Sequence, residues 1–181
     1  MLATSPIATT STRTHTSYDL DSLAQLSFAE LDAIYRTATV PTTMRAADGA
    51  LRGRMLAVRG LPAALANGLR GWAASSTFVW EGKTFQSSTD VTGVGHNRVR
   101  VPRVLGRQSL FPFETRFDAS AIDGRPTLVL DYDLDVNPPY IRRIHDEIRE
   151  VSASVFLGPA MLKRSRDKLL VLWFALDARR R

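Results

Sequence analysis

Acidic side chains, a tyrosine and a histidine that could do chemistry gather in the stretch LDYDLDVNPPYIRRIHDEI, residues 130–148. Its three alternating aspartates are Asp131, Asp133 and Asp135. They match the opening of an EF-hand calcium loop, in which carboxylate oxygens hold the ion. That loop also needs a glycine at its sixth position and a glutamate at its twelfth, where this chain has Val136 and Arg142. An EF-hand is therefore excluded.

The alternation of apolar and polar residues predicts which way this stretch faces. One face of the expected strand carries Leu128, Leu130, Tyr132 and Leu134. Tyr132 should therefore point into a core or a cavity, while Asp131 and Asp133 should lie on the outer face. We expect these aspartates to be solvated or paired with arginine rather than to act as catalytic carboxylates.

A helix is expected to follow this strand, with Asn137 as its N-cap and Pro138 in its first turn. Four apolar residues have the spacing of one helical face: Ile141, Ile144, Ile148 and Val151. His145 would then lie at the edge of the buried face. Histidine is a frequent general acid or base, and a buried tyrosine can serve the same purpose. Acid–base chemistry would therefore use Tyr132 or His145, with Lys83 or Arg142 stabilising developing negative charge.

Aromatic residues on the inward faces of several expected strands are the main signal for binding. The inward set is Phe78, Trp80, Phe85, Phe111, Phe113, Phe117, Tyr132 and either Trp173 or Phe174. These side chains would fill a core or line an apolar pocket that contains a few polar groups. The predicted ligand contacts are Trp80, Phe85, Asn97, Phe111, Phe113, Tyr132 and Trp173.

The elements that must position these residues are mostly strands. Asp19–Ala38 has helical spacing, with a capping box formed by Ser27 and Glu30, and Leu61–Ser75 is a second expected helix. From Thr77 onward, short alternating segments predominate. We expect a mainly β fold, an antiparallel barrel of about seven to nine strands with early helices and one late helix. An α+β roll is the alternative.

Two irregularities are expected within the strands. Glu81 and Gly82 could form a turn before Lys83, and Pro112 should restrict its strand to a sheet edge or a bulge because proline cannot donate to the ladder.

Composition narrows the classes of protein. The chain of 181 residues contains no cysteine, which removes disulfides and thiolate metal sites and suits a cytosolic protein. A net charge of +6 would allow nucleic-acid binding, but the arginines are spread along the chain rather than clustered. No apolar run is long enough to span a membrane. Residues 1–18 are rich in Thr and Ser and are expected to be a disordered tail, followed by a single domain at 19–181.

The order of segments resembles the uncharacterised bacterial domains named for a G-x-W-x-G motif. The resemblance is carried by Trp80-x-Gly82-Lys83-x-Phe85, by Tyr132-Asp133, by Pro138-Pro139 and by Leu157-Gly158. The defining motif itself is altered, because Met55 stands where the family has tryptophan and Ala57 where it has the second glycine. The resemblance implies a lipocalin-like β-barrel and carries no established activity.

Two functions therefore follow from the sequence. The first is binding of a small hydrophobic or aromatic molecule inside a barrel, without a metal or another cofactor. The second is a cofactor-independent isomerase, cyclase or lyase that uses Tyr132 or His145 in the same cavity. The expected partner is a small hydrophobic molecule in the cytoplasm, with no nucleic acid and no membrane, and a homodimer is left open.

Overall fold

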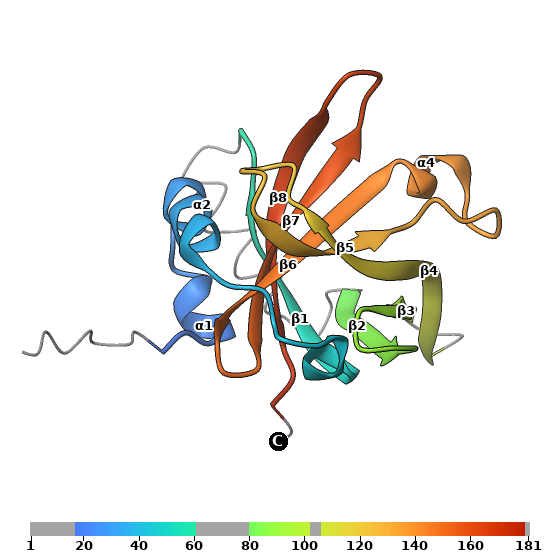
Figure 1. Cartoon of the computed structure of the whole chain (residues 1–181), viewed down its shortest axis with the longest axis horizontal. Helices are drawn as coiled ribbons and strands as arrows, with labels where there is room; N and C mark the ends of the chain where they lie inside the picture. Colours follow the sequence, from blue (N-terminus) through green and yellow to red (C-terminus); the bar gives the residue numbers. More distant parts are fainter. Residues whose placement is uncertain (1–16, 61–79, 102–105, 180–181) are drawn as a thin grey trace, which may run out of the picture.

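Eight antiparallel strands close into a β-barrel in the part of the chain that the computed structural model describes, residues 17–60, 80–101 and 106–179 (Figure 1). The strands are β1 (Gly49–Val58), β2 (Trp80–Ser87), β3 (Thr92–Val101), β4 (Gly106–Ala119), β5 (Pro126–Asp131), β6 (Ile144–Ser152), β7 (Val155–Lys163) and β8 (Lys168–Asp177). Each strand pairs with its neighbours in sequence, and β8 pairs back onto β1. The expected antiparallel barrel is thus confirmed.

Four short helices accompany the strands among the described residues: α1 (Leu20–Leu23), α2 (Phe28–Thr37), the 3-10 helix η1 (Met44–Ala47) and α4 (Pro139–Arg142). The predicted capping box at Ser27 and Glu30 starts α2. None of these helices is long and apolar enough to cross a membrane. The expected helix at Leu61–Ser75, Phe78 and residues 1–16 of the expected tail lie outside the described residues.

Alternation along the strands separates two apolar clusters, one on each face of the barrel wall. The interior cluster includes Met44, Leu51, Phe85, Phe113, Leu128, Ile148, Phe156 and Leu176. The outer cluster includes Leu23, Leu31, Tyr35, Leu56, Leu157 and Trp173. The helices α1 and α2 cover this outer cluster, where they contact β1, β6, β7 and β8 (Figure 1). Much of the wall is therefore buried on both faces.

A buried carboxylate fastens α2 to the outside of the barrel. Glu147, on the outer face of β6, accepts hydrogen bonds from Tyr35 Oη at 2.7 Å, from the hydroxyl of Ser120 and from the amide of Ala121 at 2.7 Å. His145 Nε2 lies 3.0 Å from Glu147 Oε1, the oxygen that also accepts from Ala121. Burial alone would raise the pKa of Glu147, but these hydrogen bonds outweigh it and hold the pKa below the ordinary value. The carboxylate is therefore charged, and it links Tyr35 of α2 to β6 and to residues 120–121.

The helix predicted after Pro138 is wrong beyond its first turn. The chain forms α4 and then enters strand β6 at Ile144, so Asn137 does not cap a helix but donates to the carbonyls of Pro112 and Tyr132. The isoleucine spacing fits both periods, because Ile144 and Ile148 also share one face of a strand. Pairing with β5 and β7 makes this segment a strand rather than a helix.

The two expected irregularities are both bulges. Glu81 and Gly82 lie inside β2 rather than in a turn, and the register with β3 shifts between Trp80 and Gly82. Gly82 has φ +131°, a conformation that side chains disfavour. The extra residue resets the alternation, so Trp80 and Lys83 both point inward. Opposite the 95–97 segment of β3, Pro112 occupies a second bulge, as predicted.

The outer aspartates are paired, as predicted. Asp131 accepts from Lys163 at 2.8 Å and from Arg116 at 3.2 Å. Arg142 contacts Asp133 at 2.7 Å and Asp135 at 3.0 Å.

Removing the hydroxyl of Tyr35 should loosen α2. We expect Tyr35→Phe to lower the free energy of unfolding by about 1–3 kcal/mol, because a buried hydrogen-bond partner of Glu147 is lost. Tyr140→Phe is the matched control, since Tyr140 is 67% exposed and should change stability by less than about 0.5 kcal/mol. Urea denaturation measures both, and equal effects would contradict the assigned role of Glu147.

Candidate functional site

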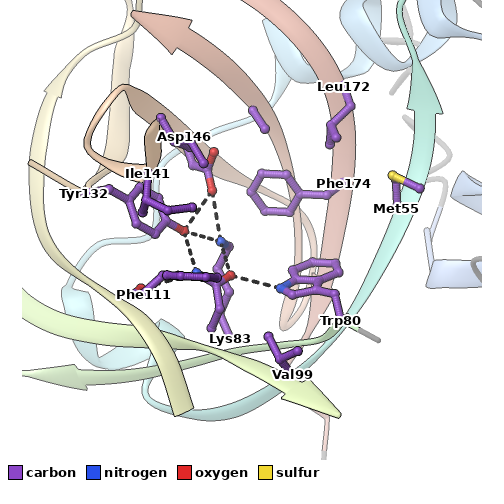
Figure 2. A pocket seen from close by; sticks show the side chains of 13 residues that line it. Met55, Trp80, Lys83, Val99, Phe111, Tyr132, Ile141, Asp146, Leu172 and Phe174 are labelled. Atoms are coloured by element: carbon purple, nitrogen blue, oxygen red, sulfur yellow. Dashed lines mark hydrogen bonds and ion pairs between the residues drawn. The ribbon is translucent and has the colours of Figure 1, made fainter. Parts of the chain in front are cut away.

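A cavity of about 400 Å³ occupies one end of the barrel interior. Its wall is almost entirely apolar and is formed by Met55, Trp80, Val99, Phe111, Ile141, Ile144, Ala160, Leu172 and Phe174. The opposite end of the interior holds the packed cluster that includes η1. Between the two lie the polar residues that also line the cavity: Lys83, Asn97, Tyr132 and Asp146. We call these four residues the polar floor (Figure 2).

An ion pair between β2 and β6 is the centre of the polar floor. Lys83 Nζ lies 2.9 Å from Asp146 Oδ2, and both side chains are at most 5% exposed. Lys83 also donates to Asn97 Oδ1 at 3.0 Å and to the hydroxyl of Tyr132. A buried charge is costly unless it is paired and hydrogen-bonded, and here both conditions are met.

Aromatic rings surround the lysine. Its Nζ lies between 5.2 and 5.6 Å from the ring centroids of Trp80, Phe113, Tyr132 and Phe174. The negative faces of such rings attract a cation, which favours the charged lysine in an apolar site. Burial lowers the pKa of Lys83, while the charge of Asp146 and its hydrogen bond act in the opposite direction.

Tyr132 joins the remaining members of the polar floor. Its hydroxyl donates to Asp146 Oδ2 at 3.1 Å and accepts from Asn97 Nδ2 at 3.2 Å. Burial, reinforced by the neighbouring charge of Asp146, raises the pKa of Tyr132 well above its ordinary value. Tyr132 is therefore a neutral hydrogen-bond donor at physiological pH.

Close approach of Gly53 to Trp80 fixes the side wall of the cavity. A Cβ atom on Gly53 would lie 2.5 Å from the Trp80 ring and 2.6 Å from the Cα of Gly82. Only glycine at position 53 therefore lets the indole come this close to β1. In this position Trp80 Nε1 donates to Asn97 Oδ1 at 2.9 Å.

Backbone strain accompanies the cavity wall at Phe111. This residue has φ +54°, which is rare for a bulky side chain, and it precedes Pro112 in the bulge of β4. Strain of this kind occurs most often at binding and catalytic sites.

Five of the predicted site residues meet at the cavity, namely Trp80, Lys83, Asn97, Phe111 and Tyr132. Phe85 and Phe113 point inward as expected but belong to the packed end, where their rings contact each other at 5.3 Å. Phe113 also packs edge-on against Tyr132, with 5.2 Å between the ring centroids, and so contacts the polar floor.

Two predicted residues lie on the opposite face of the barrel wall. Trp173 belongs to the outer cluster beneath α1 and α2, and Phe174 takes the inward position in its place. His145 faces outward toward Glu147, because the segment is strand β6 and not a helix. Neither residue reaches the cavity, which corrects their assignment to it.

Asp146 is the polar cavity residue that the sequence did not predict. On a helix whose buried face carries Ile141, Ile144 and Ile148, Asp146 would lie away from that face, whereas on β6 it shares the inward face with Ile144 and Ile148. The available signal was the alternation from Ile144 to Ile148, which fits a strand as well as a helix.

The fold and site together define a β-barrel with an internal, mostly apolar cavity and a buried polar floor. A crystal structure of a protein from Thermomonospora curvata is similar to this chain, with a TM-score of 0.52 and 22% sequence identity over 86% of this chain and 89% of that one. At this identity the likeness supports the fold alone. No family model matches the chain, and a search of curated proteins gives no match either.

Replacing one member of the central ion pair should lower the free energy of unfolding more than replacing both members. We expect Lys83→Met to lower the free energy of unfolding by about 3–5 kcal/mol, because Asp146 remains as an unpaired buried charge. Lys83→Met combined with Asp146→Leu should recover most of that loss.

A partly exposed pair of similar length provides the control. Lys163 and Asp131 lie 2.8 Å apart on the outer face, with side chains about one quarter exposed. Lys163→Met should therefore cost about 1 kcal/mol or less. Denaturant unfolding compares all variants, and a loss for Lys83→Met no larger than for Lys163→Met would contradict the buried pair.

Proposed function

We propose that this protein binds a small, mostly apolar molecule inside its barrel. The observation that carries the proposal is the cavity of about 400 Å³, whose wall is carbon-rich and whose floor is polar. This volume lies in the ordinary range of small-molecule sites, which are apolar with a few fixed polar groups. Eight-stranded barrels commonly hold one small ligand in this way.

The resemblance to the G-x-W-x-G domains implies a lipocalin-like barrel, an architecture in keeping with this proposal. Trp80, one of the residues that carry the resemblance, lines the cavity. In this proposal the barrel is lipocalin-like, the small molecule is its partner, and neither nucleic acid nor a membrane takes part. Absence of cysteine is in keeping with a cytoplasmic location.

Filling the cavity should abolish binding without unfolding the protein. Ala160 lines the cavity, so Ala160→Phe would occupy ligand space. Val94→Phe adds an aromatic ring at a position that is 45% exposed and serves as the matched control. We expect apolar metabolites from a broad library to raise the melting temperature of the wild type and of Val94→Phe, but not of Ala160→Phe. Equal shifts in all three proteins, or none in the wild type, would contradict the proposal.

A second function is favoured by the charges of the polar floor. An acid–base isomerase, cyclase or lyase needs a polar pair inside its cavity, and here Tyr132 stays protonated beside the carboxylate of Asp146. In this version Asp146, rather than His145, would be the base and Tyr132 the acid.

Isotope exchange separates the two functions. A ligand identified by the melting screen would be incubated with the protein in D₂O and analysed by mass spectrometry. An isomerase that removes and returns a carbon-bound proton would introduce deuterium into the ligand, and Tyr132→Phe would slow that exchange by about 100-fold or more. A ligand recovered without deuterium supports binding alone.

A further inference from the structure

The hydrogen-bonding capacity of the polar floor is almost completely used within the protein. Lys83 has three N–H donors, and they go to Asn97, Tyr132 and Asp146. The ammonium group therefore has no donor left for a ligand.

The hydrogen-bond donors and acceptors of Asn97 and Tyr132 are also engaged within the protein. Asn97 Oδ1 accepts from Trp80 and Lys83, and its Nδ2 donates to the Tyr132 hydroxyl and to the carbonyl of Phe111. The Tyr132 hydroxyl accepts from Lys83 and Asn97 and donates to Asp146. Both lone pairs and the single proton of this hydroxyl are thus engaged.

One acceptor remains. Asp146 Oδ2 receives Lys83 and Tyr132, whereas Asp146 Oδ1 is buried and has no hydrogen-bond partner in the described part of the chain. Figure 2 shows the dashed lines reaching one oxygen of this carboxylate and none reaching the other. Asp146 is only 4% exposed and lines the cavity. A buried carboxylate oxygen without a partner is costly, so the site is suited to a molecule that supplies a donor.

We infer that the ligand is a neutral apolar molecule that carries a hydroxyl group, and that this hydroxyl donates its hydrogen bond to Asp146 Oδ1. The inference rests on the proposed function and adds the chemical class of the ligand. Because the polar floor offers an acceptor and no donor, the ligand is recognised as a hydrogen-bond donor.

The charge of the polar floor excludes two other head groups. Lys83 and Asp146 together are neutral, and the lysine is already saturated. A carboxylate would place a second negative charge against Asp146 in an apolar cavity, with no donor to receive it. An ammonium group would leave a net positive charge in the cavity, at the cost of desolvating it. A fatty acid, whose apolar chain would otherwise suit the cavity, is therefore disfavoured.

Two matched sets of three ligands test the inference on the wild-type protein. Decanol, decyl methyl ether and decanoate share one chain, and naphthol, methoxynaphthalene and naphthoate repeat the comparison on a rigid ring. The ether keeps the oxygen but cannot donate. Isothermal titration calorimetry should show the alcohol binding about 10- to 100-fold more tightly than the ether, as expected for a hydrogen bond to a charged group. The carboxylate should bind most weakly.

Two double variants assign the preference to Asp146. In Lys83→Met/Asp146→Leu the ratio of alcohol to ether affinity should fall by about tenfold, because the charged acceptor is gone and only the neutral groups of Asn97 and Tyr132 remain. In Lys163→Met/Asp131→Leu, which removes the outer pair, the ratio should stay at its wild-type value. If the first variant does not fold, the wild-type ratios decide the question by themselves.

The outcomes separate the inference from the proposed function. Equal binding of alcohol and ether, tightest binding of the carboxylate, or an unchanged ratio in the Lys83→Met/Asp146→Leu variant would overturn the hydroxyl inference and leave the binding function standing. If none of the six compounds bound at its solubility limit, both would be overturned.

Discussion

The ion pair between Lys83 and Asp146 is the interaction on which the interior of this barrel depends. The strands β2 and β6 lie on opposite sides of the closed ring, so the pair reaches across the barrel rather than along its wall. On one side of it lie buried apolar side chains of the interior cluster, such as Met44, Phe85 and Phe113, and on the other side lies the cavity. A partition made of charges is unusual in an apolar interior, and it persists here because aromatic rings and hydrogen bonds surround both ions.

Local alternation was enough to predict the class of fold and much of the cavity. Asn97 and Tyr132 lie on strands or strand ends whose two faces differ clearly in polarity, and both point inward as expected. The capping box of α2 and the bulge at Pro112 were also predictable, since each depends on the chemistry of one or two neighbouring residues. Features with a local cause were thus accessible from the sequence.

Features set by distant parts of the chain were not accessible. The strands β6 and β8 face the barrel interior on one side and contact helices on the other. Polar and apolar residues therefore do not alternate along these two strands. For this reason Trp173 and Phe174 could not be told apart, and Asp146 looked like an exposed helical residue. Its inward direction makes sense only beside Lys83, which is 63 residues away in sequence. The bulge at Gly82 changes the alternation of β2 so that Lys83 points inward, and the sequence did not predict this bulge either.

Two consecutive acids on β6 have a consequence for how the strand finds its place. Asp146 is satisfied only from inside the barrel and Glu147 only from outside, by groups on separate elements. A slip of β6 by one residue would exchange the two faces and leave both carboxylates buried without their partners. The two acidic residues therefore fix the register of β6, because each finds its partners on only one face of the barrel wall. Apolar residues of the strand could not fix the register, because they can be buried on either face.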